Sequence, residues 1–282
     1  MPCACLSSGR WANIVHMLLP HFTSLGSGPL VLMLHGAGGG YRSFAPQVEQ
    51  YAMQGFQAVA WDMPGYGLSA PVEPYGVRGL ANSCIHLIEA LLPQDAPPPQ
   101  RSVVLLGHGL GGMVAQEVVM RRPDLVNRLV LSASTSGPDS GWADEAQRQS
   151  VLLDGVANDM QQLTEAVLPG QTGPLALPAG VQLARYCMAQ LSPVTYRLAL
   201  QAQAAFDRDA ALAQIHVPTL LIAGEQDRLA PGSTIERMAR KIAGSRWVQM
   251  PGIGHWVHLE SPDAFDALVL DFLHERAEQW LH

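Results

Sequence analysis

The chain has 282 residues, of which 48% are hydrophobic and 15% are charged, so it carries enough apolar material for a buried core and does not belong to the disordered class. Its formal net charge of −7 argues against nucleic acid or an anionic membrane surface as a partner. No apolar run reaches the ~20 residues that span a bilayer, and the N-terminus lacks the features of a secretory signal, so we expect a soluble cytoplasmic protein.

Six short runs predict strands, and the apolar runs at residues 30–34 and 103–106 are typical of buried strands. In chain order they cover residues 30–34, 56–61, 103–106, 129–131, 220–223 and 247–250. Helical spacing predicts helices over residues 44–52, 77–92, 113–120 and 262–280. Strands that alternate with helices predict an α/β fold, with a doubly wound, mostly parallel sheet that is covered on both faces.

One stretch departs from this alternation. Residues 136–210 contain helical patterns and turns but no candidate strand. We interpret this stretch as an inserted helical cap, which leaves residues 1–135 and 211–282 for the core. Residues 1 to about 14 read as a loose tail.

Cysteine and lysine usage adds two minor expectations. The four cysteines are Cys3, Cys5, Cys84 and Cys187; they have no metal-ligand spacing, and we expect them to be reduced. Lys241 is the only lysine, a bias that favours a GC-rich bacterial source.

A glycine-rich junction connects the strand at 103–106 to the helix at 113–120. It reads Gly107-His108-Gly109-Leu110-Gly111-Gly112. A nucleophile elbow has the pattern G-x-S-x-G at such a junction, with glycines where strand and helix approach closely and a central residue at positive φ. The string also fits the dinucleotide pattern G-x-G-x-x-G, but it lies in mid-chain, and Arg128 stands near the position where that pattern needs an acid.

Four further segments agree with the elbow. Upstream are Leu34-His35-Gly36 and the turn from Asp62 to Ser69; downstream are the loops 224–231, with Asp227, and 251–256, with His255. In this order, from about residue 30 to 280, the segments resemble the α/β-hydrolase family.

The resemblance implies a role for each site residue. His255 is the general base and Asp227 orients it, with Glu225 a weaker candidate for the acid. The backbone N–H groups of Ala37 and Leu110 form the oxyanion hole. Gly109 occupies the place of the nucleophile but has no oxygen with which to attack. The chemistry requires no metal and no organic cofactor.

Several neighbouring polar residues have structural interpretations. We expect the His108 side chain to point away from the site and His35 to brace its own loop. Asp62 is interpreted as a turn residue, and His258 as a metal ligand only if further ligands converge on it.

Three explanations of Gly109 remain open. It replaces a serine in an inactive variant; or the chain is a natural non-hydrolase, such as a ligand receptor or a cofactor-free lyase or oxygenase that uses His255 as a base; or a water molecule held beside His255 supports slow hydrolysis.

The Met and aromatic residues of the cap favour a small or medium apolar substrate. Residues 205–220 resemble the corresponding region of bacterial enol-lactonases and carboxylesterases, which favours an ester or lactone. A carbon–carbon bond hydrolase is the alternative. The side chains that either line an apolar pocket or form the core of the cap are Trp142, Met160, Tyr186, Met188 and Tyr196, with Leu163, Leu191 and Phe206. Arg185 or Arg197 is a possible partner for a substrate carboxylate. The oligomeric state is not predicted.

Overall fold

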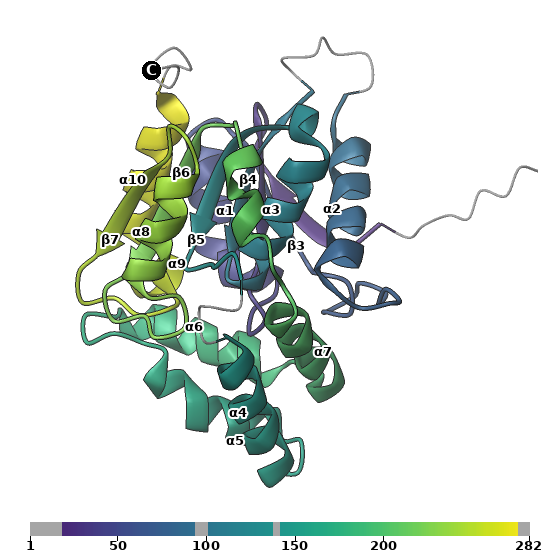
Figure 1. The fold of residues 1–282 in the computed structure, drawn as a ribbon, viewed down its shortest axis with the longest axis vertical. Coiled ribbons are helices and arrows are strands. Elements are labelled where there is room, and N and C mark those ends of the chain that lie inside the picture. Colours follow the sequence, from purple (N-terminus) through teal and green to yellow (C-terminus); the bar gives the residue numbers. More distant parts are fainter. Residues whose placement is uncertain (1–18, 94–100, 138–141, 276–282) are drawn as a thin grey trace, which may run out of the picture.

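A computed structural model describes residues 19–93, 101–137 and 142–275, and it shows a central sheet with helices on both faces (Figure 1). Seven strands lie in the order β1-β3-β2-β4-β5-β6-β7; β1 is antiparallel to β3 and every other pair is parallel. The strands are β1 (Phe22–Leu25), β2 (Leu30–Leu34), β3 (Gln57–Trp61), β4 (Val103–His108), β5 (Val126–Ser132), β6 (Thr219–Gly224) and β7 (Arg246–Met250).

The six predicted strands are confirmed. Continuous apolar runs are stable in a parallel sheet where helices cover both faces, but β7, at the edge of the sheet, is mostly half-buried or exposed. Every residue of β2, β4 and β6 is buried. The prediction missed β1, a four-residue strand, Phe22–Leu25, at the edge of the sheet. Its residues are only half-buried or exposed, so it carries neither an apolar run nor a period of two.

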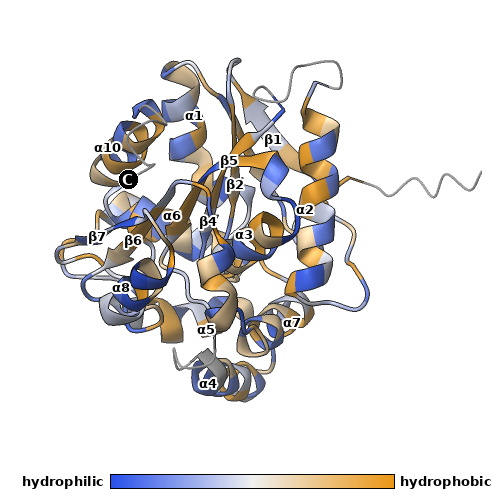
Figure 2. Ribbon diagram, turned by 45° about the horizontal axis from the view of Figure 1, so that its top comes forward, coloured by the Kyte–Doolittle hydropathy of each residue, from blue (hydrophilic) through white to orange (hydrophobic). Residues whose placement is uncertain are grey.

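Helices α1 (Ala45–Met53) and α10 (Pro262–His274) pack on each other against one face of the sheet, and α2 (Val77–Leu91) and α3 (Leu110–Arg121) pack together on the other (Figures 1 and 2). Two more helices, α8 (Gly232–Lys241) and α9 (Val257–Glu260), follow β6 and β7. In Figure 2 the central strands are hydrophobic along their length, whereas hydrophobic and hydrophilic residues alternate along the helices. Helix α10 ends at His274, before the predicted residue 280, because Glu275 has extended backbone angles.

Among the described residues, four α-helices lie between β5 and β6, grouped beyond one end of the sheet (Figure 1). They are α4 (Trp142–Gly155), α5 (Met160–Val167), α6 (Pro178–Ala189) and α7 (Pro193–Ala204). Asp159 caps α5 by accepting the N–H of Gln161 at 2.8 Å. This is the segment in which the sequence predicts a cap; its boundaries at residues 136 and 210 stay a prediction.

Some expectations concern parts of the chain that the structure does not describe. The predicted N-terminal tail, Cys3 and Cys5 fall there. Within the described ranges, Cys84 and Cys187 are free thiols, and none of the helices combines the length and apolarity needed to cross a bilayer.

The contact between α1 and α10 predicts a pH-dependent stability. Asp266 of α10 is 5% exposed beside Tyr51 and Gln47 of α1, and burial raises the pKa of its carboxyl to about 6. The folded chain therefore binds this proton more tightly than the unfolded chain, whose carboxyl has a pKa of about 3.9. The contribution of this group favours folding fully below about pH 4 and is lost as pH rises through about 6.

Asp266→Asn keeps the neutral shape at every pH. We expect the free energy of unfolding of this variant, relative to the parent, to rise by up to about 3 kcal/mol between about pH 4 and pH 7.5. Urea unfolding at several pH values measures the difference. A difference that does not vary with pH would show that Asp266 titrates normally.

Candidate active site

The junction between β4 and α3 is a sharp turn centred on Gly109, which has φ 52° and ψ −118°. A Cβ atom on Gly107 would lie 2.4 Å from the carbonyl oxygen of Gly111, and one on Gly111 would lie 2.0 Å from that of Leu34. These two glycines are required because backbone atoms occupy the space of a side chain.

Gly109 is different, because a side chain there has room. A Cβ atom built on Gly109 meets nothing closer than 3.6 Å, at the Cα of Gly36 and at the Nε2 of His255. A side chain at this position would therefore point at the imidazole. The only obstacle to it is the positive φ, which costs a non-glycine residue about 1–3 kcal/mol.

This contrast predicts the stability of two alanine variants. Gly109→Ala should lower the free energy of unfolding by about 1–3 kcal/mol through backbone strain alone. Gly111→Ala should yield little folded protein, because its Cβ would overlap the strand backbone. Chemical denaturation and soluble yield measure the two effects, and equal losses would contradict the difference in space.

His255 lies in the loop after β7 and Asp227 in the loop after β6, so the parallel sheet brings them to the same edge. The Nδ1 of His255 is 2.9 Å from Oδ2 of Asp227, and both residues are buried. The other oxygen of Asp227 accepts the N–H groups of Leu229 at 2.8 Å and Ala230 at 3.1 Å. The carboxylate is thereby held in one orientation, with the Nε2 of His255 facing Gly109.

The N–H group of Ala37 has its direction fixed by the carbonyl on the same peptide plane. That carbonyl, of Gly36, accepts the N–H of Gly39 at 3.0 Å and Nδ1 of His35 at 2.8 Å. His35 carries its proton on Nδ1, because its Nε2 accepts the N–H of Met63 at 2.9 Å. His35 therefore braces the loop, as the sequence predicts.

The N–H group of Leu110 is fixed in the same way. The carbonyl of Gly109 accepts the hydroxyl of Ser134 at 2.8 Å and the N–H of Gly112 at 3.0 Å. Leu110 is the first residue of α3, where helical N–H groups have no partner within the helix. Across the described chain, the N–H groups of Ala37 and Leu110 donate no backbone hydrogen bond. Two oriented donors, one of them at the N-terminus of α3, suit a developing oxyanion.

A segment between α5 and α6 is attached to the loop of His255. The carbonyl of Gln171 accepts the N–H of His255 at 2.7 Å. The carboxylate of Glu260 accepts N–H groups from Gly173 at 2.8 Å, Gly254 at 2.7 Å and Trp256 at 2.9 Å. Burial raises the pKa of the Glu260 carboxyl, and the three N–H groups oppose the shift. Glu260 thus connects the segment between α5 and α6 to the residues on both sides of His255.

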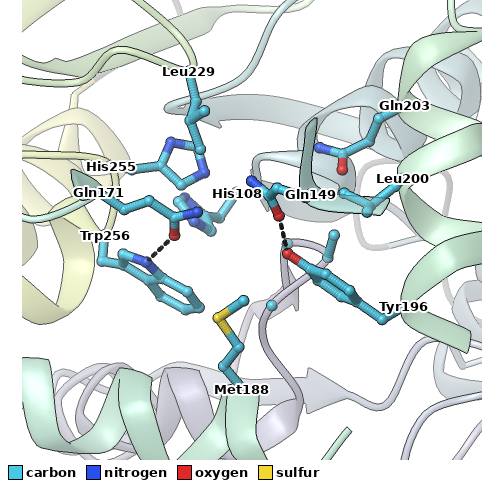
Figure 3. Close-up of a pocket in the computed structure, with 13 residues that line it drawn as sticks. His108, Gln149, Gln171, Met188, Tyr196, Leu200, Gln203, Leu229, His255 and Trp256 are labelled. Atoms are coloured by element: carbon cyan, nitrogen blue, oxygen red, sulfur yellow. Dashed lines mark hydrogen bonds between the residues drawn. The ribbon is translucent and has the colours of Figure 1, made fainter. Parts of the chain in front are cut away.

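A cavity of about 350 Å³, including its opening, is lined by Gly36 and His255, the two residues that lie nearest a Cβ atom built on Gly109. Figure 3 shows the residues that line it. Of the predicted pocket residues, Met188 and Tyr196 line it. The full lining comprises Gly36, Ala37, Gly38, His108, Gln149, Gln171, Met188, Tyr196, Leu200, Gln203, Leu229, His255 and Trp256.

The structure places the other predicted pocket residues elsewhere. Met160 is packed in the hydrophobic core through the buried face of α5. Tyr186 lines a second cavity, of about 430 Å³, beside Gly39 and Gly40 and away from Gly109. The side chain of Trp142 lies outside the described part of the chain.

The two candidate arginines are paired with acids instead of facing the cavity. Arg185 contacts Glu165 at 2.9 Å and Arg197 contacts Asp154 at 2.6 Å. Neither arginine lines the cavity beside His255.

His108 corrects an expectation, because its side chain does not point away from the site. Its ring centroid is 4.8 Å from that of His255 and 4.6 Å from that of His258. Burial, with the nearby rings, holds the pKa of His108 well below its usual value. Burial, with His255, lowers the pKa of His258 to about 3. Both rings are therefore uncharged; His108 packs against His255, and His258 packs against His108.

The sequence did not predict the polar side chains that line the cavity, nor the role of Glu260 in holding the segment between α5 and α6. Gln149, Gln171 and Gln203 face the cavity from helices or turns, where a lone glutamine carries no signal. Glu260 lies five residues after His255, and its distance along the chain was the only available hint.

The chain matches known proteins over most of its length. A model of the alpha/beta hydrolase family matches residues 31–268. A 2-hydroxy-6-oxononadienedioate/2-hydroxy-6-oxononatrienedioate hydrolase of Pseudomonas putida is 28% identical over 290 residues, covering 95% of this chain and 96% of that protein. Polyketide synthase ThaQ of Burkholderia thailandensis is 29% identical over 259 residues, which are 89% of this chain but 12% of that protein.

A solved structure shows the same fold. The enol-lactonase from Burkholderia xenovorans LB400 superposes with a TM-score of 0.77 at 24% identity, over 90% of this chain and 96% of that one.

Proposed function

The chain belongs to the alpha/beta hydrolase family, and from this premise we propose that it is a carboxylic ester or lactone hydrolase whose nucleophile position is occupied by Gly109. The observation that carries the proposal is the 3.6 Å between a Cβ at residue 109 and Nε2 of His255. All other groups that acyl transfer needs surround that point.

A serine at position 109 would complete the reaction. Its hydroxyl would attack the ester carbonyl while Nε2 of His255 takes the proton. The N–H groups of Ala37 and Leu110 would hold the oxyanion, and His255 would return the proton to the leaving alkoxide. Water would then release the acid by the same steps. In the chain as it stands, glycine provides no covalent route.

The cavity lining favours a neutral substrate. Among the described residues, no Lys, Arg, Asp or Glu side chain lines it. A dianion such as the dioate in the name of the Pseudomonas putida relative would enter without a cationic partner. A neutral ester or lactone therefore fits better than the substrate of a carbon–carbon bond hydrolase of that type.

A second candidate follows from the combination of an ordered His255–Asp227 pair and a missing nucleophile. His255 would act as a base on a bound substrate, or on a water molecule, without a covalent intermediate. A cofactor-free lyase or a ligand receptor would have this arrangement.

Installing Gly109→Ser distinguishes the two. We expect the variant to hydrolyse p-nitrophenyl esters of short or medium acyl chains, and neutral lactones, with saturation kinetics. Gly109→Ala, which has the same backbone strain, is the matched control and should remain inactive. If Gly109→Ser folds but is no more active than Gly109→Ala, the second candidate replaces the first.

A further inference from the structure

Three glutamines line the cavity beside His255, and the protein itself holds two of them. Gln149 accepts the hydroxyl of Tyr196 and donates to Glu145. Gln171 accepts the indole N–H of Trp256 at 3.0 Å. These two amides are therefore fixed parts of the wall (Figure 3).

Gln203 of α7 is the exception. Its side chain is 2% exposed, and neither its Oε1 nor its Nε2 has a hydrogen-bond partner among the described residues. It lines the cavity, and Figure 3 shows its amide on the inner side of α7, facing the space in front of His255. Its neighbours on the buried side of α7 include Ala199 and Leu200.

Such an amide is unfavourable in the empty protein. A buried polar group without a partner weakens folding, and leucine has a similar shape without that penalty. A molecule bound in the cavity would complete the hydrogen bonds of this carboxamide.

We propose that Gln203 recognises a neutral amide-type group of the substrate, such as a carboxamide, lactam or ureido group. These groups present a carbonyl oxygen and an N–H side by side. Nε2 of Gln203 donates to that oxygen, and its Oε1 accepts from that N–H. A carboxylate would offer no donor to Oε1 and would find no cation in the lining. That the amide-type group belongs to a substrate rests on the proposed function. That the cavity binds such a group does not rest on it.

Binding to the unaltered chain is the first test, because Gly109 keeps the ligands from rapid turnover. Calorimetry would compare methyl ω-carbamoylalkanoates and ω-carbamoylalkyl acetates, each with two to four methylenes, with isosteres in which an isopropyl group replaces the carboxamide. We expect at least one carbamoyl ester to bind about tenfold more tightly than its isostere or better.

Gln203→Leu should abolish or reverse that preference, while Gln201→Leu, on the exposed side of the same helix, should keep it. Gln203→Leu should also melt at the same or a higher temperature, since it removes an unpaired buried amide. If Gln203→Leu leaves the ratio of the two affinities unchanged, or if no carbamoyl ester in either series is preferred, the assignment is wrong.

The same ester pairs, hydrolysed by the Gly109→Ser protein, separate this proposal from the proposed function. We expect Gln203→Leu to lower kcat/KM for the preferred carbamoyl ester by about tenfold or more and to spare the isopropyl ester. Preferential binding without any hydrolysis would overturn the hydrolase proposal alone. Hydrolysis with no effect of Gln203 on the ratio would overturn the recognition alone.

Discussion

Removing the imidazole of His255 from the Gly109→Ser protein is expected to lower kcat for its best ester by about 10⁴–10⁶-fold. The reason is that Nε2 lies 3.6 Å from a Cβ atom built on residue 109, where it can accept the proton of a serine hydroxyl. Asp227→Asn should cost about 10⁴-fold, because an amide would favour the wrong tautomer of His255. Stopped assays with p-nitrophenyl esters measure both losses.

Glu225→Gln is the matched control for the acid. Glu225 is exposed and accepts the N–H of Gly252 at 2.7 Å, so it has a local structural role and no contact with His255 in the part of the chain that the structure describes. Its substitution should leave kcat within the same order of magnitude. A larger loss of kcat from Glu225→Gln than from Asp227→Asn would show that Glu225, and not Asp227, is the acid.

Replacing Glu260 by alanine should lower both the stability of the protein and the activity of its Gly109→Ser form. Three N–H groups, of Gly173, Gly254 and Trp256, would lose one common acceptor, and the free energy of unfolding should fall by about 3 kcal/mol or more. Because two of these groups flank His255, kcat of the Gly109→Ser protein should fall by about 10²-fold as the imidazole loses its position.

Glu260→Gln refines the test. Its oxygen can keep the bonds to Gly173 and Gly254, but its amino group then faces the N–H of Trp256, so only about 1–2 kcal/mol should be lost. Glu236→Ala, which breaks an exposed pair with Arg240, should cost less than about 1 kcal/mol. Equal losses in Glu260→Ala and Glu236→Ala would show that the carboxylate does not anchor the loop.

The sequence predicts the parallel strands of the central sheet, and the residues that follow them, well. Apolar runs identify the parallel strands, and residues that follow such strands meet at one edge of the sheet, so Gly109, Asp227 and His255 were expected together. The edge strand β1 was not predicted, because its four half-buried or exposed residues show no hydrophobic periodicity.

The helices between β5 and β6 are the part of the chain where the sequence predicts least. Helical periodicity identifies a buried face, but it does not distinguish burial against a neighbouring helix, as for Met160, from burial against a cavity, as for Met188. The unpaired amide of Gln203 depends on which groups lie opposite it in space. His108 was misplaced for the same reason, since packing by His255 and His258 joins residues about 150 positions apart.

The convergence on residue 109 is tested most directly by a crystal structure of the Gly109→Ser protein labelled with a fluorophosphonate. We expect the label on residue 109, its phosphonyl oxygen about 2.7–3.1 Å from the backbone nitrogens of Ala37 and Leu110, and the imidazole of His255 beside the new bond. A label on another residue, or an imidazole farther from residue 109 than one bridging water can span, would contradict the arrangement described above.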